Sequence, residues 1–114
     1  MNKYTALGLL AAAAEGKRII VVSASNVAVK AALDEVAAVA DVWETGAKAA
    51  HAAGHGYVAL PDGGDITFIK PSGLRGCSAD VVLVEDSWNV DGPALVDDLH
   101  ATVRASGFGE IVRY

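Results

Sequence analysis

Two short apolar runs constrain the fold of this chain more than any other feature of its sequence. Arg18–Val22 contains four consecutive β-branched residues, and Val81–Val84 is apolar throughout. A strand with one solvated face alternates apolar and polar residues, whereas a strand of a parallel sheet is covered on both faces and is apolar along its length. The two runs therefore predict strands inside a largely parallel sheet.

Helical segments lie on both sides of the first strand. Residues 2–15 are good helix formers in which Ala and Leu fill nearly all sides, so this helix is expected to be buried or covered by a partner. Gly16 is well placed to end it. Ser25 or Asn26 can cap a second helix, which extends to about Ala40. One face of this helix is apolar and consists of Val29, Leu33, Val36 and Ala40.

The remaining segments continue the alternation of strands and helices. Asp41 can cap a further helix over residues 42–53, and residues 57–60 and 66–69 form a hairpin around the Pro-Asp-Gly-Gly turn at 61–64. A loop over 71–80, a helix over 93–106 that starts at Pro93, and a last strand at Glu110–Arg113 complete the chain. Residues 1–114 are thus expected to form a single α/β domain, a mainly parallel sheet with flanking helices in three layers plus a small hairpin.

Composition excludes several classes of site. The one cysteine, Cys77, allows no intramolecular disulfide and no cysteine-based zinc site, and it has no identifiable base partner for a role as nucleophile. His51 and His55 have the spacing of ligands on one helix face, but the glycines on either side of His55 argue against a helix there. We interpret them as solvated histidines and expect no metal.

The net charge of −5 argues against a general nucleic-acid coat and leaves room only for a local basic patch. No apolar run reaches membrane-spanning length without a charge or a turn. The apolar stretch near the N-terminus runs directly into a strand, so we interpret it as an integral helix and not as a signal peptide. The expected location is the cytoplasm, that of a bacterial host if a phage encodes the chain.

Residues 57–86 contain a hairpin, a Leu-Arg-Gly loop around Arg75, and four apolar residues that lead into Glu85 and Asp86. This order resembles the stretch before the acidic motif of RecA-like P-loop ATPases of the helicase and phage-terminase type. In that family the first acid holds Mg²⁺ and the second polarises the attacking water. A buried parallel strand presents such acids at the carboxyl edge of the sheet, where open α/β folds bind ligands. Here the usual Asp-Glu order is reversed, which changes the reach of each carboxylate.

The N-terminal segment resembles the same family, so the resemblance covers most of the chain. An apolar helix opening at Lys3, a strand, and the turn Ser23-Ala24-Ser25-Asn26 follow one another as they do after the family's phosphate-binding loop. The loop pattern G-x-x-x-x-G-K-[ST] does not occur in the sequence. The resemblance therefore implies a truncated core without the Walker A loop, and we expect no cofactor, no catalytic residue and no NTP hydrolysis.

The candidate site residues follow from this resemblance. Glu85 and Asp86 are the remnant of the acidic motif, and candidates for phosphate, DNA or intersubunit contacts are Arg75, Lys70, Lys3, Ser23, Ser25 and Asn26. Simpler interpretations stay open: solvated carboxylates at 85 and 86, a loop brace from Arg75 to Asp80 or Glu85, and a helix cap at 23–26. Trp43 and Trp88 are interpreted as core or interface residues, not as platforms for stacking bases.

The expected function is that of a non-catalytic, self-assembling relative of a phage-type helicase or terminase ATPase domain. It would act as an accessory factor that binds DNA or another protein. In the related cores the missing first strand lies beside the strand equivalent to Glu110–Arg113, so its loss leaves an exposed sheet edge that invites pairing. A homo-oligomer, such as a hexameric ring, is the expected state. Two alternatives stay open: a nucleotide-binding protein or ATPase completed in trans by a partner subunit, and an unrelated small α/β ligand-binding module.

Overall fold

A computed structural model describes residues 3–43, 45–52, 55–61, 63–73, 79–84 and 110–113. Two helices, α1 (Lys3–Ala14) and α2 (Asn26–Val42), flank the strand β1 (Arg18–Val22) in sequence. The strands β2 (Lys48–Ala52), β3 (His55–Ala59) and β4 (Asp65–Ile69) follow. A single 3₁₀ turn, η1 (Pro71–Gly73), and the strands β5 (Val81–Val84) and β6 (Glu110–Arg113) complete the described elements. The helix expected over 93–106 lies outside the described residues.

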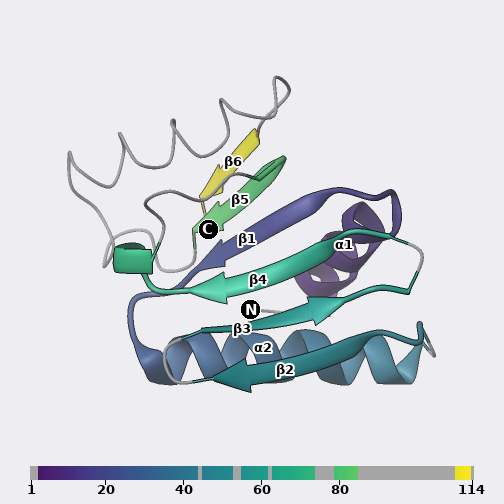
Figure 1. Ribbon diagram of the computed structural model, residues 1–114, viewed down its shortest axis with the longest axis horizontal. Helices are drawn as coiled ribbons and strands as arrows, with labels where there is room; N and C mark the ends of the chain where they lie inside the picture. Colours follow the sequence, from purple (N-terminus) through teal and green to yellow (C-terminus); the bar gives the residue numbers. More distant parts are fainter. Residues whose placement is uncertain are drawn as a thin grey trace.

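The strands form one sheet in the order β2-β3-β4-β1-β5-β6 (Figure 1). β1 lies parallel to β4 and β5, and β5 lies parallel to β6. The hairpin β3–β4 and the outer pair β2–β3 are antiparallel. The mainly parallel α/β sheet with flanking helices and a small hairpin is therefore confirmed, and β6 is the last strand of the described sheet.

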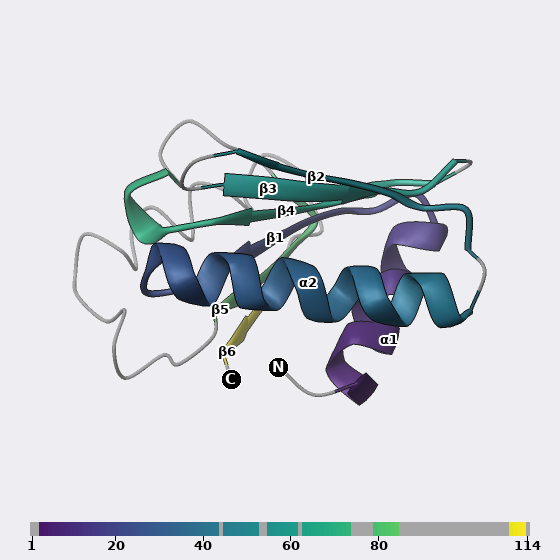
Figure 2. The same ribbon diagram turned by 90° about the horizontal axis from the view of Figure 1, so that it is seen from below.

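Both described helices cover the same face of the sheet, with α1 crossing α2 at a steep angle (Figure 2). The core on this face is formed by the apolar stripes of the helices and the inward residues of the strands, among them Leu10, Leu33, Val36, Ile19, Val21 and Phe68. Ile20, Val22, Val82 and Val84 alternate with residues of that core and are also buried. The apolar runs are thus covered on both faces, as their sequence predicts.

The helix expected over residues 42–53 is wrong. α2 continues to Val42, and Lys48–Ala52 forms the edge strand β2 beside β3. The segment Ala-Lys-Ala-Ala-His-Ala-Ala has high helix propensity, but each residue of β2 is paired with one of β3 in the sheet. Tertiary pairing of this kind outweighs a propensity of a few tenths of a kcal/mol per residue.

Two glycines bring the elements into close contact. The Gly64 N–H donates to the Ala13 carbonyl at 2.6 Å, which holds the β3–β4 turn against the C-terminal end of α1. A Cβ at Gly56 would lie 2.8 Å from a methyl carbon of Leu33, so only glycine lets α2 pack this closely on β3. At the end of α1, Gly16 has a φ of 90°, in agreement with the helix end predicted there.

Candidate functional site

The parallel strands end together at one edge of the sheet. Val22 at the end of β1 is level with Ile69 of β4 and with Val84 of β5, and Val84 is level with Arg113 of β6. In Figure 1 the arrowheads of β4, β1, β5 and β6 point toward the same side of the molecule. This carboxyl edge is where open parallel sheets bind ligands, and it is the place predicted for the candidate site.

The turn after β1 is built from two serines with different surroundings. Ser23 is fully buried, and its N–H donates to the Ile69 carbonyl at 2.9 Å, which extends the β1–β4 ladder by one residue. Ser25 is exposed, has an extended backbone with φ −143° and ψ 166°, and accepts a hydrogen bond from the Ala28 N–H at 3.1 Å. Ser25 is therefore the N-cap of α2, as the simpler interpretation of this turn predicts, and Asn26 is the exposed first residue of the helix.

Lys70 lies at the same edge, directly after β4. It is half-buried, and its carbonyl accepts a hydrogen bond from the Gly73 N–H at 3.0 Å, which closes the turn η1. The register that aligns Val22 with Ile69 places Ser23 and Lys70 on neighbouring strand ends. The described part of the edge thus combines the N-terminus of α2, a buried serine, a capping serine and Lys70.

The other predicted site residues stay predictions, because their positions or side chains are outside the described structure. Arg75, Glu85, Asp86, Trp88 and Cys77 lie outside the described residues, and Lys3 begins α1 without a described side chain. Asp80, one of the two partners suggested for Arg75, accepts a hydrogen bond from the Arg18 N–H at 3.0 Å, and its own N–H donates to the Arg18 carbonyl at 2.8 Å. These bonds join the starts of β1 and β5, at the opposite edge of the sheet.

The two histidines lie on opposite faces of the antiparallel pair β2–β3. Because paired residues of an antiparallel ladder point to the same face, His51 shares a face with its partner Gly56, and His55 shares the other with Tyr57. Both histidines are exposed. Within the described ranges no group of three or more His, Cys, Asp or Glu could hold a metal ion.

An apolar surface between the two helices was not anticipated as a site. A hollow of about 490 Å³ opens between the first turns of α1 and the last turns of α2, and it is lined by Tyr4, Leu7, Ala38, Val39, Val42 and Trp43. Trp43 follows the last residue of α2 and is 65% exposed. The interpretation of Trp43 as a core residue is therefore wrong, and its interpretation as an interface residue stays a prediction. The sequence signal for this surface is the lack of a polar side on residues 2–15.

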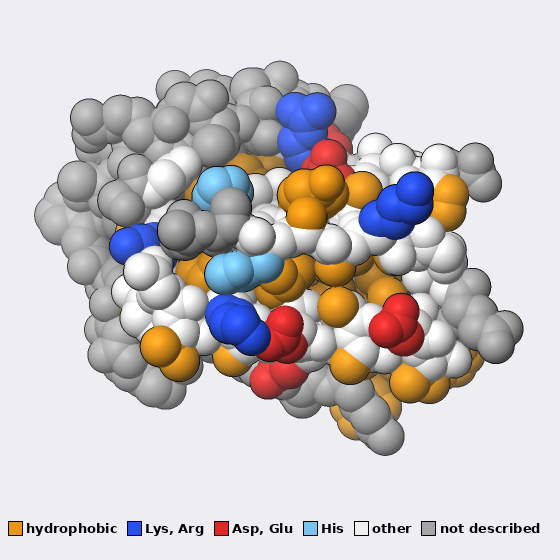
Figure 3. Space-filling model, turned by 60° about the horizontal axis from the view of Figure 1, so that its bottom comes forward, with side chains coloured by type: hydrophobic (Ala, Val, Ile, Leu, Met, Phe, Trp, Pro, Cys, Tyr) orange, Lys and Arg blue, Asp and Glu red, His pale blue; other side chains and the backbone are white. Residues whose placement is uncertain are grey.

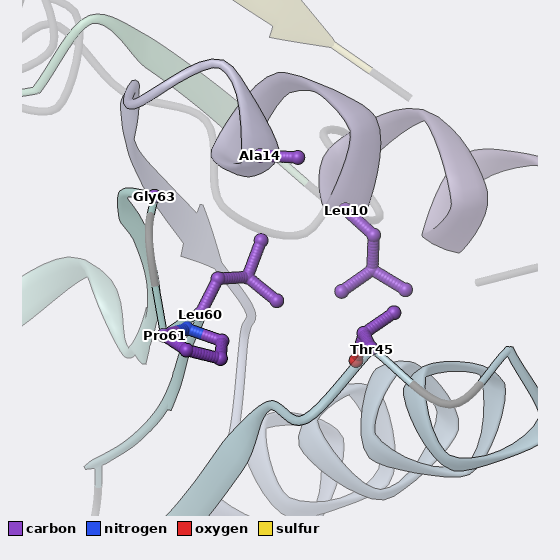
Figure 4. A pocket seen from close by; sticks show the side chains of 6 residues that line it. All are labelled: Leu10, Ala14, Thr45, Leu60, Pro61 and Gly63. Atoms are coloured by element: carbon purple, nitrogen blue, oxygen red, sulfur yellow. The ribbon is translucent and has the colours of Figure 1, made fainter.

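A second hollow, of about 300 Å³, lies where the β3–β4 turn meets the end of α1 and the connection to β2 (Figure 4). Leu10, Leu60 and Pro61 give it a mostly apolar wall. The Thr45 hydroxyl on its rim donates to the Ala40 carbonyl and accepts from the Ala47 N–H, both at 3.2 Å. This hollow lies by the start of β4, at the edge of the sheet opposite the strand ends.

Basic side chains are scattered over the side of the molecule that carries β2 and α2 (Figure 3). The pair formed by Lys30 and Asp34, 2.9 Å apart, shows that basic charge on α2 is partly balanced by a neighbouring acid. Clustered lysines and arginines are the usual mark of a DNA-binding face, and this side of the described structure does not show them. Among the described helices none is long and apolar enough to cross a membrane.

The fold is that of the ATPase domain of phage large terminases. The large terminase of a thermophilic bacteriophage superimposes with a TM-score of 0.67 over 95% of this chain and 28% of its own, at 8% identity. The large terminase ATPase domain of a Thermus phage gives 0.61 over 96% and 51%, at 12% identity. The first of these two enzymes, in its complex with ADP, gives 0.61 over 87% and 26%, at 9% identity.

The chain thus spans between about a quarter and about half of the length of these proteins. No family model and no curated protein matches the sequence. The structural similarity confirms the terminase-type fold that the order of motifs predicts.

Proposed function

We propose that this chain is a non-catalytic, self-assembling relative of the terminase ATPase domain that acts as an accessory factor by binding a protein or DNA. The observation that carries the proposal is the combination of the terminase-type fold with a large exposed apolar surface on α1 and α2. Tyr4, Val42 and Trp43 are each about two-thirds exposed or more. An exposed apolar surface of this extent usually marks a site of contact with another molecule.

The absence of activity is supported by the groups available for nucleotide. Triphosphates are held in P-loop proteins by the backbone N–H groups of a glycine-rich loop and by its lysine. The 114 residues contain no such pattern. At the described carboxyl edge, Ser25 caps its own helix, and Lys70 is the cation that follows β4. These two groups offer less to a triphosphate than a glycine-rich loop and its lysine do.

Between the two kinds of partner, the charge favours protein. A net charge of −5 and the scattered basic side chains in Figure 3 disfavour an extended contact with phosphates. The apolar surface on α1 and α2, and β6 as the last strand of the described sheet, favour contacts between protein chains.

Two measurements test the proposal. Size-exclusion chromatography with light scattering at micromolar concentration is expected to give a multiple of the 11.6 kDa chain mass. Calorimetric titration with ATP and Mg²⁺ is expected to give no heat beyond dilution. A single 11.6 kDa species at all concentrations would contradict self-assembly, and micromolar binding of ATP by the isolated chain would contradict the non-catalytic assignment.

A second candidate function is nucleotide binding or hydrolysis completed in trans by a partner subunit. It is favoured by the fact that a terminase of the same fold was solved with ADP and with ATP-γ-S, and by the preserved carboxyl edge of the parallel strands. Titration of ATP without and then with the candidate partner separates the two functions, because only the second predicts binding that requires both chains. Lys70→Ala would weaken that binding if the edge described here is the nucleotide site.

A further inference from the structure

The hollow between α1 and α2 has the composition of a protein contact. Its lining consists of Tyr4 and Leu7 from α1 together with Ala38, Val39, Val42 and Trp43 from the end of α2. None of these six side chains carries a charge. Figure 2 shows that α1 crosses α2 steeply.

The exposed part of this surface has the size of an interface core. Tyr4 is 73% exposed, Val42 79% and Trp43 65%. An aromatic side chain has a surface of about 150–250 Å². At the exposed fractions given above, Tyr4, Trp43 and the smaller Val42 together expose on the order of 400 Å² of mainly apolar surface. A stable interface of standard size buries roughly 800 Å² per partner, about 57% of it non-polar, with an apolar core inside a polar rim. One copy of this surface therefore supplies the apolar core that one side of such an interface needs.

We propose that the surface defined by these six residues binds the same surface of a second copy of this chain around a two-fold axis. Trp43 lines the hollow and is 65% exposed, and a hollow of about 490 Å³ is large enough to receive an aromatic ring. An exposed aromatic side chain and a hollow on one face can be matched by the same pair on a second copy, and a two-fold contact requires such self-complementarity. The inference rests on the self-assembly proposed above and locates its contact.

Charge also selects this surface for contact between copies. Two chains that each carry a net charge of −5 repel each other, so they associate best through a face without acidic side chains. Asp34, in the middle of α2, is paired with Lys30 and is not among the residues that line the hollow. The uncharged lining allows desolvation of the contact without burying a carboxylate.

The test compares two lysine substitutions inside the surface with one outside it. Trp43→Lys and Val42→Lys are expected to raise the dissociation constant of self-association by at least about 30-fold, the effect of losing an interface hot spot. Val27→Lys is the matched control, because Val27 lies on the same helix, is 81% exposed and is remote from the hollow. It is expected to change the constant by no more than about twofold. Analytical ultracentrifugation over a concentration series measures all four proteins, and circular dichroism verifies that each is folded.

The outcomes separate this inference from the proposed function. If the unmodified chain self-associates and both Trp43→Lys and Val42→Lys associate as tightly as it does, the two-fold contact is wrong and self-assembly stands. If the unmodified chain is monomeric, both are wrong. If Val27→Lys weakens association as much as Trp43→Lys does, the effect comes from added charge on α2 and the surface defined here is not the contact. Should one variant fail to fold, the other gives the same comparison.

Discussion

At the scale of single residues, Gly64 allows the β3–β4 turn to pack directly against the backbone that connects α1 to β1. The β3–β4 turn is held against α1 by the hydrogen bond from Gly64 to Ala13. A Cβ at position 64 would overlap the Lys17 carbonyl oxygen and would lie 2.6 Å from the Lys17 carbonyl carbon. These are backbone atoms at the connection between α1 and β1, and they cannot move away as the end of a side chain could.

Gly64→Ala is therefore expected to destabilise the protein by about 2–3 kcal/mol, at the upper end of overpacking effects. Gly8→Ala is the matched control, because position 8 lies inside α1 with no atom within 4 Å of the added Cβ. Alanine there is expected to be neutral or stabilising by up to about 1 kcal/mol. Urea denaturation followed by circular dichroism measures both. Equal stability of the two variants would show that the β3–β4 turn does not pack against the α1–β1 connection as described.

Residue patterns alone predicted the parts of the site that depend on neighbours in sequence. The cap at Ser25 was readable because an N-cap acts on a backbone N–H only three residues away. The exposure of Trp43 was not readable, because it depends on where α2 ends and on how α1 crosses that end. The level strand ends at Val22 and Val84 follow from the parallel sheet that the apolar runs predict.

At the scale of elements, the contrast between β1 and β2 shows what sequence can specify. β1 is a run of β-branched residues that favours a strand by itself. β2 is Lys-Ala-Ala-His-Ala, which favours a helix by itself and forms a strand because β3 offers it a paired edge. The hairpin β3–β4 was predictable from its Pro-Asp-Gly-Gly turn. The outer strand β2 was not predictable, because its pairing with β3 depends on tertiary contacts and not on its own residues.

The packing of α2 on β3 depends on a pair of residues, Leu33 and Gly56. A Cβ at position 56 would meet a Leu33 methyl at 2.8 Å and the Ala50 carbonyl oxygen at 3.0 Å. Gly56→Ala is expected to cost about 1–3 kcal/mol in the native background. In a Leu33→Ala background the methyl is gone, so the same change is expected to cost less, with a coupling of at least about 0.5 kcal/mol. A double-mutant cycle from urea denaturation measures the coupling, and strictly additive effects would mean that the clash with Ala50 governs the site alone.

At the scale of the whole molecule, the net charge of −5 sets how any assembly responds to salt. The molecule measures 40 × 31 × 24 Å, so the centres of two associated copies lie roughly one molecular width apart. At that distance the repulsion between two such charges is felt at low ionic strength and is screened when the Debye length falls to a few ångströms. An apolar contact between copies loses nothing from this screening.

Raising the salt concentration from about 0.02 M to about 0.5 M is therefore expected to strengthen self-association by about a factor of 5, equivalent to ~1 kcal/mol. Binding to DNA has the opposite dependence, because salt opposes the release of counterions from phosphates. Sedimentation equilibrium in a salt series measures the first, and fluorescence anisotropy with a labelled duplex under the same conditions measures the second. Self-association that weakens with salt would mean that ion pairs hold the copies together, and the uncharged surface on α1 and α2 would then not be the contact that drives assembly.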